Sequence, residues 1–261
     1  MDTLDLLVGT VGLRPYVFAF LAAFLSIALA EIGPWRTLVW TVLGYAIAFA
    51  CEWSSTRNGF PFGLYHYLDA ATRGRELWIS NVPFMDSLSF VFLSFVSFST
   101  ARRLLRAPAR PDGRVEGGAA VIALAAVLMT AIDLVCDPVS LRGDRWFLGR
   151  IYYYAEPGAF FGVPLSNFVG WTVLAVFIVG AMRGLERVGV LRGAPLYALP
   201  RPELFAPGLY LGIVLFNAAI AFWIGLAPLG WLGLAIAGGV ALGCARSAVP
   251  VLASAGLEEV R

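Results

Sequence analysis

The sequence predicts an all-α protein, a polytopic integral membrane helix bundle with about seven transmembrane helices. Of its 261 residues, 59% are hydrophobic and only 14% are charged, and the mean hydropathy is +0.79. A chain of this composition cannot present a mostly polar surface to water, so lipid is the expected solvent. Because a helix needs about 20 residues to cross the hydrocarbon core and unpaired backbone groups are costly there, each long apolar run is expected to be helical.

Seven apolar runs are long enough to be spans, and together they are expected to form a single membrane domain over residues 1–261. The third run is rich in serine and contains Asp86, so it is expected to face other helices and not lipid. Gly239 and Gly243 in the last run are expected to form a helix packing contact. The expected spans lie near residues 14–32, 35–53, 82–102, 118–137, 163–183, 207–226 and 228–248.

The distribution of arginine predicts the orientation of the bundle. The chain has no lysine, and many of its arginines fall in two loops, 102–117 and 183–206. The positive-inside rule places both loops in the cytoplasm, which puts the N-terminus outside and the C-terminus inside the cell membrane. The bias is moderate, because Arg57, Arg142 and others lie on the opposite side. The first apolar run follows acidic residues and has no convincing cleavage site, so we expect it to be retained.

Several classes of function are not expected for this chain. The basic residues form no single patch, which argues against a nucleic-acid partner. The cysteines Cys51, Cys136 and Cys244 are scattered through apolar runs, without the spacing of a zinc site or a disulfide framework. His66 is the only histidine, too few for a di-iron hydroxylase, and no phosphate-binding glycine loop is present. We therefore expect no metal and no cofactor.

Acidic side chains cluster at one end of the predicted bundle. Asp133 and Asp137 are four residues apart and so share one helix face. Ionisable groups within spans are costly and usually mark a functional site. The structural alternative is that each acid pairs with an arginine, such as Arg57, Arg142 or Arg145, and fastens a loop to the bundle. Four acids and one amide share the non-cytoplasmic end: Glu52, Asp86, Asp133, Asp137 and Asn167.

The two long loops at the same end, 54–81 and 138–162, are rich in aromatic residues and glycine. Together with the acids they predict a polar pocket with aromatic walls where lipid meets water. The alternative is an interfacial belt, because tyrosine and tryptophan collect at membrane surfaces in any case. Carboxyl groups crowded into a site of low dielectric repel, so one keeps a proton while another stays ionised. Such a pair can supply both the acid and the base for chemistry on an apolar substrate.

Four segments are long and mixed enough in composition to be specific: EWSSTRNGFPFGLYHY (52–67), DLVCDP (133–138), GDRW (143–146) and FGVPLSNFVGW (161–171). Together they resemble the carotenoid biosynthesis family that includes the CruF-type carotenoid 1,2-hydratases. The resemblance runs from about the second span to the sixth, in the same order. It implies addition of water across the C1,C2 double bond of an acyclic ψ-end, as on lycopene, γ-carotene or a bacterioruberin precursor, and it implies no cofactor.

Hydration of such an alkene needs a proton donor, stabilisation of a tertiary cation and a base for the attacking water. We expect Asp133 or Asp86 to donate the proton, and Asp137 or Glu52 to orient and deprotonate water. Asn58 and Asn167 would hold water or fix a carboxyl group, and the end-group pocket would be lined by Tyr65, Tyr67, Trp146, Tyr153 and Trp171. The expected partners are a carotenoid, water and membrane lipid, with association of other carotenoid-pathway enzymes.

Two other functions fit the same residues. A carotenoid cyclase, or another isoprenoid-modifying enzyme, would begin by protonating the same double bond. A proton-coupled transporter could use buried acids, but it would be expected to carry them near the membrane midplane. Here the acids cluster at one end.

Overall fold

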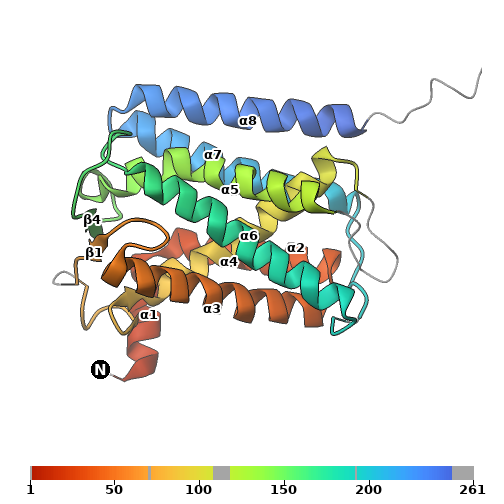
Figure 1. The fold of residues 1–261 in the computed structure, drawn as a ribbon, viewed down its shortest axis with the longest axis horizontal. Helices are drawn as coiled ribbons and strands as arrows, with labels where there is room; N and C mark the ends of the chain where they lie inside the picture. The colour runs from red at the N-terminus through yellow and green to blue at the C-terminus, as the bar shows by residue number, and fades with distance from the viewer. Residues whose placement is uncertain (1, 70–71, 108–117, 192, 249–261) are drawn as a thin grey trace, which may run out of the picture.

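The computed structural model describes residues 2–69, 72–107, 118–191 and 193–248. Long helices dominate it, and the extended segments are only two or three residues long (Figure 1). The α-helices are α1 Thr3–Leu13, α2 Pro15–Glu31, α3 Pro34–Asn58, α4 Phe84–Leu104, α5 Ala119–Ser140, α6 Leu165–Arg187, α7 Phe205–Trp223 and α8 Ala227–Ala248. The shorter elements are strands β1 Tyr65–Tyr67, β2 Trp78–Ile79, β3 Val82–Pro83 and β4 Tyr152–Tyr154, and 3₁₀ turns η1 Gly143–Arg145 and η2 Pro202–Leu204.

The predicted fold class, an all-α membrane bundle, is confirmed. Within the described residues, 6 helices are long and apolar enough to cross a membrane, and the number rises to 7 if α1 and α2 count as one bent span. Helices α2 to α8 run along the long axis of the molecule and are joined at alternating ends (Figure 1). The helix at the expected span 35–53 is longer than predicted. It continues to Asn58, so Glu52 lies inside α3 and not at its end.

Helix α4 lies at the centre of the bundle and packs against α2, α3, α5, α6, α7 and α8. Of its apolar segment 83% is buried, compared with at most 50% in the other five candidate spans. Most of its serines make hydrogen bonds: the Trp40 indole donates to Ser94 Oγ (3.1 Å), and Ser94 donates to the Val91 carbonyl (3.0 Å). Among the described residues, Ser97 Oγ has no partner. The predicted orientation of the third span is therefore confirmed, and Asp86 is carried into the interior.

Helix α1 was not among the expected elements. It begins with a capping box in which Asp2 and Asp5 each accept a backbone N–H of the other. Pro15 cannot continue an N–H ladder, and the chain turns by 94° between α1 and α2. As a result α1 is nearly perpendicular to α2 and projects from one side of the bundle (Figure 1), and its Thr10 hydroxyl accepts the N–H of Leu77 (2.8 Å).

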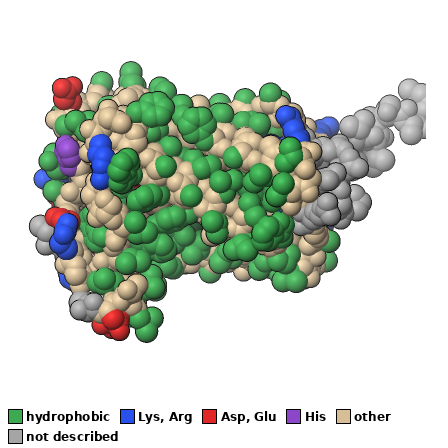
Figure 2. All heavy atoms as spheres, turned by 60° about the horizontal axis from the view of Figure 1, so that its bottom comes forward, with side chains coloured by type: hydrophobic (Ala, Val, Ile, Leu, Met, Phe, Trp, Pro, Cys, Tyr) green, Lys and Arg blue, Asp and Glu red, His purple; other side chains and the backbone are tan. Residues whose placement is uncertain are grey.

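Hydrophobic side chains cover the middle of the molecule, whereas charged ones gather toward its two ends (Figure 2). One end is closed by buried ion pairs, Arg102 with Glu31 (2.8 Å) and Arg36 with Glu186 (3.8 Å). The same end carries further arginines, among them Arg103, Arg106, Arg183, Arg187 and Arg246. Arg110, Arg114 and Arg192, which contributed to the predicted orientation, lie outside the described residues.

Of the two glycines predicted to pack in the last span, only Gly243 makes a close helix contact. A Cβ atom on Gly243 would lie 2.6 Å from Leu104 Cδ2, so this glycine permits close contact with α4. Nothing lies within 4 Å of the corresponding position at Gly239. The two residues therefore do not form a joint packing motif.

The opposite end of the bundle is covered by the two long aromatic loops. Strand β1 from the first loop pairs antiparallel with β4 from the second, with Tyr65 opposite Tyr154 and Tyr67 opposite Tyr152. Side chains alternate between the two faces of a strand, so these four tyrosines point toward the bundle. His66 and Tyr153, at the centre of the two strands, point away from it and lie against each other (5.5 Å between ring centroids).

Candidate active site

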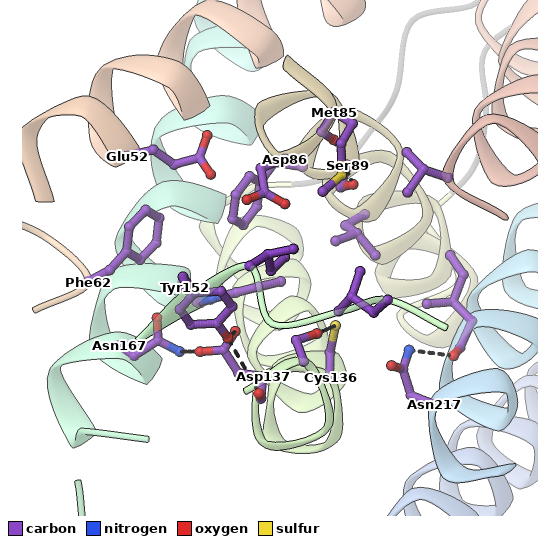
Figure 3. Close-up of a pocket in the computed structure, with 18 of the residues that line it drawn as sticks. Glu52, Phe62, Met85, Asp86, Ser89, Cys136, Asp137, Tyr152, Asn167 and Asn217 are labelled. Atoms are coloured by element: carbon purple, nitrogen blue, oxygen red, sulfur yellow. Dashed lines mark hydrogen bonds between the residues drawn. The ribbon is translucent and has the colours of Figure 1, made fainter. Parts of the chain in front are cut away.

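A cavity lies in the bundle beneath strands β1 and β4 (Figure 3). Its volume is about 130 Å³, and one ordered water needs roughly 10–15 Å³ of such space. Its walls come from α2, α3, α4, α5, α6 and α7 and from both aromatic loops. The cavity therefore has room for a substrate group together with water.

Three carboxyl groups from three different helices line this cavity: Glu52 of α3, Asp86 of α4 and Asp137 of α5 (Figure 3). Glu52 is only 2% exposed, whereas Asp86 and Asp137 are partly open toward the cavity. These acids were expected to cluster at one end of the bundle, and there they line a single cavity. Such a group of ionisable side chains in an apolar cavity is a candidate acid–base site.

Tyr67 connects two of these acids. Its hydroxyl donates a hydrogen bond to Glu52 Oε1 (2.7 Å), and the same hydroxyl interacts with the carboxyl group of Asp86. Ser87 donates a hydrogen bond to the other oxygen of Glu52. Burial raises the pKa of Tyr67 well above that of a free phenol, and the carboxyl groups of Asp86 and Glu52 raise it further. Tyr67 therefore remains a protonated donor between the two acids.

Asp137 accepts hydrogen bonds from three side chains. Tyr152 donates to Oδ1 (2.7 Å), while Tyr154 (2.6 Å) and the amide of Asn167 (2.8 Å) donate to Oδ2. Burial raises the pKa of Tyr152 and of Tyr154 well above the usual value, and the nearby Asp137 carboxyl adds to both shifts. Three donors around one carboxyl group suit an ionised acceptor, because a protonated carboxyl would offer a proton where a donor already points.

Asp133 lies behind this group and does not line the cavity. Its side chain is fully buried (0% exposed), and its Oδ2 accepts a hydrogen bond from the Asn167 amide (2.7 Å). The same amide nitrogen donates to Asp137, so Asn167 bridges the two aspartates across one helical turn. Within the described residues, Asp133 Oδ1 has no hydrogen-bond partner. Asp133 can therefore act on the cavity only through Asn167 and Asp137.

Aromatic rings form the remaining walls of the cavity. Trp171 packs edge-on against Phe90 (4.8 Å), and Phe62 stacks on Phe90 (5.8 Å). Trp146 and Tyr16 form a second wall, with ring centroids 6.1 Å apart. Five of the residues expected to line the pocket or to hold water lie in these walls: Tyr65, Tyr67, Trp146, Asn167 and Trp171.

Two residues expected at the pocket lie elsewhere. Tyr153 is 38% exposed, because it occupies the outward face of β4 between two inward tyrosines. Asn58 is exposed at the end of α3, where its Oδ1 accepts the Ser54 hydroxyl (3.1 Å) and the N–H of Phe60 (2.9 Å). Asn58 thus stabilises the turn after α3, and neither residue lines the cavity.

Sequence reasoning missed several residues that the cavity uses. Tyr152 and Tyr154 could have been found from the alternation of a strand, once the YYY segment was placed in one. Asn217, in the apolar helix α7, carries an amide inside a span, which is itself a signal of a polar contact or site. Ser87 could not be singled out among the serines of α4, because only the packing of α3 shows which of them meets Glu52.

The proposed alternative of arginine-fastened loops is not supported in the described part of the chain. No ion pair there joins Glu52, Asp86, Asp133 or Asp137 to an arginine. Arg57 instead stacks on Trp53 and donates to Asn81 Oδ1 (2.9 Å), and Arg142 donates to the carbonyl of Phe161 (2.9 Å). In the described ranges, no group of three or more histidine, cysteine, aspartate or glutamate side chains could hold a metal ion.

A family model described as carotenoid biosynthesis protein matches residues 12–242. The chain belongs to the carotenoid biosynthesis protein family. This membership gives it a role in carotenoid biosynthesis and confirms the predicted resemblance. The match includes the first expected span and extends into the last one as far as residue 242, both beyond the four resembling segments, and it includes every residue of the cavity. No curated protein and no solved structure matches the chain.

Proposed function

We propose that this member of the carotenoid biosynthesis family is a hydratase that adds water across the C1,C2 double bond of an acyclic ψ-end group. The observation that carries the proposal is the cavity itself: three carboxyl groups from three helices face one aromatic-walled space at one end of the bundle. An acid and a base facing an apolar end group are what cofactor-independent hydration requires.

In the proposed reaction, Asp86 gives its proton to C2 and leaves a tertiary cation at C1. A water molecule then forms a bond from its oxygen to C1 and loses a proton to Asp137, which yields the tertiary alcohol. Transfer of a proton from Asp137 back to Asp86 completes the cycle, so the net change is the addition of one water. We assign proton donation to Asp86 and not to Asp133 because Asp86 opens onto the cavity, while Asp133 is fully buried behind Asn167.

The environment of each acid supports its proposed role. Asp137 is surrounded by three hydrogen-bond donors, which suits the ionised form that a base needs. Tyr67 can hand a proton between Glu52 and Asp86, because its hydroxyl contacts both. The rings of Trp171, Phe90 and Trp146 line the same cavity and would stabilise the positive charge that develops at C1.

The position of the site suits the two substrates. A carotenoid is about as long as the hydrocarbon core is thick, roughly 30 Å, so its end group reaches the membrane surface when the chain spans the bilayer. The cavity lies at such an end, where water is available. We further propose that this end faces away from the cytoplasm, since the arginine-rich end carries the ion pairs of Arg102 and Arg36. Other carotenoid-pathway enzymes are proposed partners in the same membrane.

Expression in a lycopene-accumulating bacterial host, followed by mass spectrometry of the extracted pigments, tests the proposal. We expect products that carry one or two added waters, and none with an Asp86→Asn variant that reaches the membrane in equal amount. A cyclised product of unchanged mass would show a cyclase instead. Unchanged lycopene and unchanged γ-carotene, with the protein confirmed in the membrane, would overturn the hydratase assignment and favour a transporter.

A further inference from the structure

The cavity has an apolar limb that the hydration chemistry does not use. On one side lie the carboxyl groups and the tyrosine hydroxyls, at the ends of α3 and α5. On the other side the walls come from α2, α4 and α7 and are mostly apolar; their polar groups include the Tyr16 hydroxyl and the Asn217 amide, which donates to the Ile213 carbonyl (3.0 Å). This limb is lined by Val17, Phe20, Phe92, Leu93, Ile213 and Phe216.

Aromatic rings form the contact between α2 and α7 at this limb. Phe216 of α7 stacks on Tyr16 of α2 (5.4 Å) and meets Phe20 edge-on (5.7 Å), and all three rings line the cavity. Phe147, which is 52% exposed, lies against both Tyr16 (5.7 Å) and Phe216 (6.4 Å). Tyr16, Phe20 and Phe216 are themselves only partly buried, whereas the Trp171, Phe90 and Phe62 wall is buried.

The length of the cavity makes an opening necessary for a long substrate. Its lining residues on α4 run from Met85 to Leu93, a distance of about 12 Å along the helix axis. A carotenoid is about as long as the hydrocarbon core, roughly 30 Å. More than half of the chain must therefore lie outside the cavity when the end group is at the acids. The only solvent that takes up such a chain is lipid, and it must be reached through a wall of the bundle.

We infer that the seam between α2 and α7 is the lateral opening through which a linear polyene enters from the bilayer, with the Phe216 ring as its gate. The inference rests on the proposed function in that the occupant is a ψ-end polyene. When Phe216 swings away from Tyr16 and Phe20, the end group passes between α2 and α7 into the apolar limb. The rest of the chain stays in lipid along the seam.

Uptake of lycopene from liposomes tests the gate separately from catalysis. The purified full-length protein is incubated with lycopene-loaded liposomes and re-isolated, and the bound lycopene is extracted and quantified by absorbance over time. Phe216→Trp, which fills the seam, is expected to reduce uptake by about tenfold or more. Phe216→Ala, which thins the wall, is expected to make uptake faster than in the wild type. Leu215→Trp is the matched control, because Leu215 is 42% exposed on the same helix and does not line the cavity.

The outcomes separate the gate from the hydration. Opposite effects of Trp and Ala at position 216, with Leu215→Trp like the wild type, support the gate even if no water adduct forms, in which case the hydratase proposal fails alone. Water adducts with uptake unchanged in both Phe216 variants overturn the gate and leave the hydratase proposal standing. Equal losses in Phe216→Trp and Leu215→Trp overturn it as well, as does a wild type that takes up no lycopene.

Discussion

Each carboxyl group of the cavity has its own set of neighbours, and these sets separate the roles that the residues can play. Asp137 is held by two tyrosines and an asparagine, and Glu52 by Tyr67 and Ser87. Asp86 instead opens toward the cavity, beside the hydroxyl of Tyr67. A group that must approach the substrate has to be accessible to it, so Asp86 is the residue on which the proposed chemistry depends most.

Replacing Asp86 by Asn is therefore expected to reduce hydration by at least about a hundredfold, the usual effect of removing a general acid. The amide keeps the size of the side chain, so the variant should still fold and insert. The rate is measured as the ratio of hydrated to unchanged carotenoid, normalised to the amount of protein in the membrane. Asp144→Asn, an exposed aspartate on η1, serves as control, and equal rates in the two variants would remove Asp86 from the mechanism.

Asp133 is expected to position Asn167 without touching the substrate. Asp133→Leu removes an acceptor of the Asn167 amide and should lower the hydration rate by about tenfold, the cost of losing a hydrogen bond to a charged group. Asp133→Asn keeps an oxygen at that place and should restore most of the rate. A merely structural role would instead make both variants equally unstable, which thermal unfolding of the purified proteins would reveal. An Asp133→Asn protein as inactive as Asp86→Asn would return proton donation to Asp133.

At the scale of elements, the conformation of strand β4 determines which of the consecutive tyrosines 152–154 belong to the site. Tyr152 and Tyr154 point inward and Tyr153 outward, because side chains of a strand alternate. Tyr65 and Tyr67 were predicted to line the pocket and do so, but Tyr152 and Tyr154 could not be told from Tyr153, since a loop without a known register has no defined inner face. The pairing of β1 with β4 supplies that register from a distant part of the chain.

The alternation gives a comparison between neighbouring residues. Tyr154→Phe removes a hydrogen bond to the Asp137 carboxyl and is expected to lower the hydration rate by roughly tenfold or more, given about 1.5–3 kcal/mol for such a bond. Tyr153→Phe removes the same atom from the outer face and should leave the rate unchanged. Both rates are read from pigment mass spectra. A larger loss in Tyr153→Phe would contradict the orientation of the strand.

Helix α6 carries a second matched pair. A Cβ atom on Gly170 would lie 2.5 Å from Phe62 Cδ1 and 2.7 Å from the Pro61 carbonyl oxygen, whereas nothing lies within 4 Å of that position at Gly180. Gly170→Ala should therefore push the Phe62 segment off α6 and destabilise the protein by about 1–3 kcal/mol. Gly180→Ala should be neutral or slightly stabilising. Thermal unfolding in detergent distinguishes the two, and equal melting temperatures would contradict the close packing.

At the scale of the whole molecule, hydropathy was sufficient to predict the fold class, because lipid forces long apolar runs to be helices. It also placed the acids at one end of the bundle. It could not show that Asp133 is covered by Asn167, since residues four apart share a helix face and only the neighbouring helix α6 decides which of them is reached. Helix α1 was not predicted, because its 11 residues are too few to span a membrane and it projects from the side of the bundle.

The orientation of the bundle is also testable as a whole. We expect a green fluorescent protein fused to the C-terminus to fluoresce, because that protein matures in the cytoplasm, where the arginine-rich end is proposed to lie. Alkaline phosphatase fused within the α7–α8 loop should be active, because it needs the non-cytoplasmic side. The reverse pattern would place the cavity at the cytoplasmic surface and would leave the chemistry of the site unaffected.

The bundle has a reaction chamber at one end, while buried ion pairs close the other. A symmetric substrate with two reactive termini would therefore need two separate visits. After the first terminus is converted, the chain must leave, turn end for end in the bilayer and return. The half-processed molecule would then be a free intermediate, open to capture by any neighbouring enzyme, so the balance between symmetric and asymmetric pigments would be decided in the lipid and not in the protein.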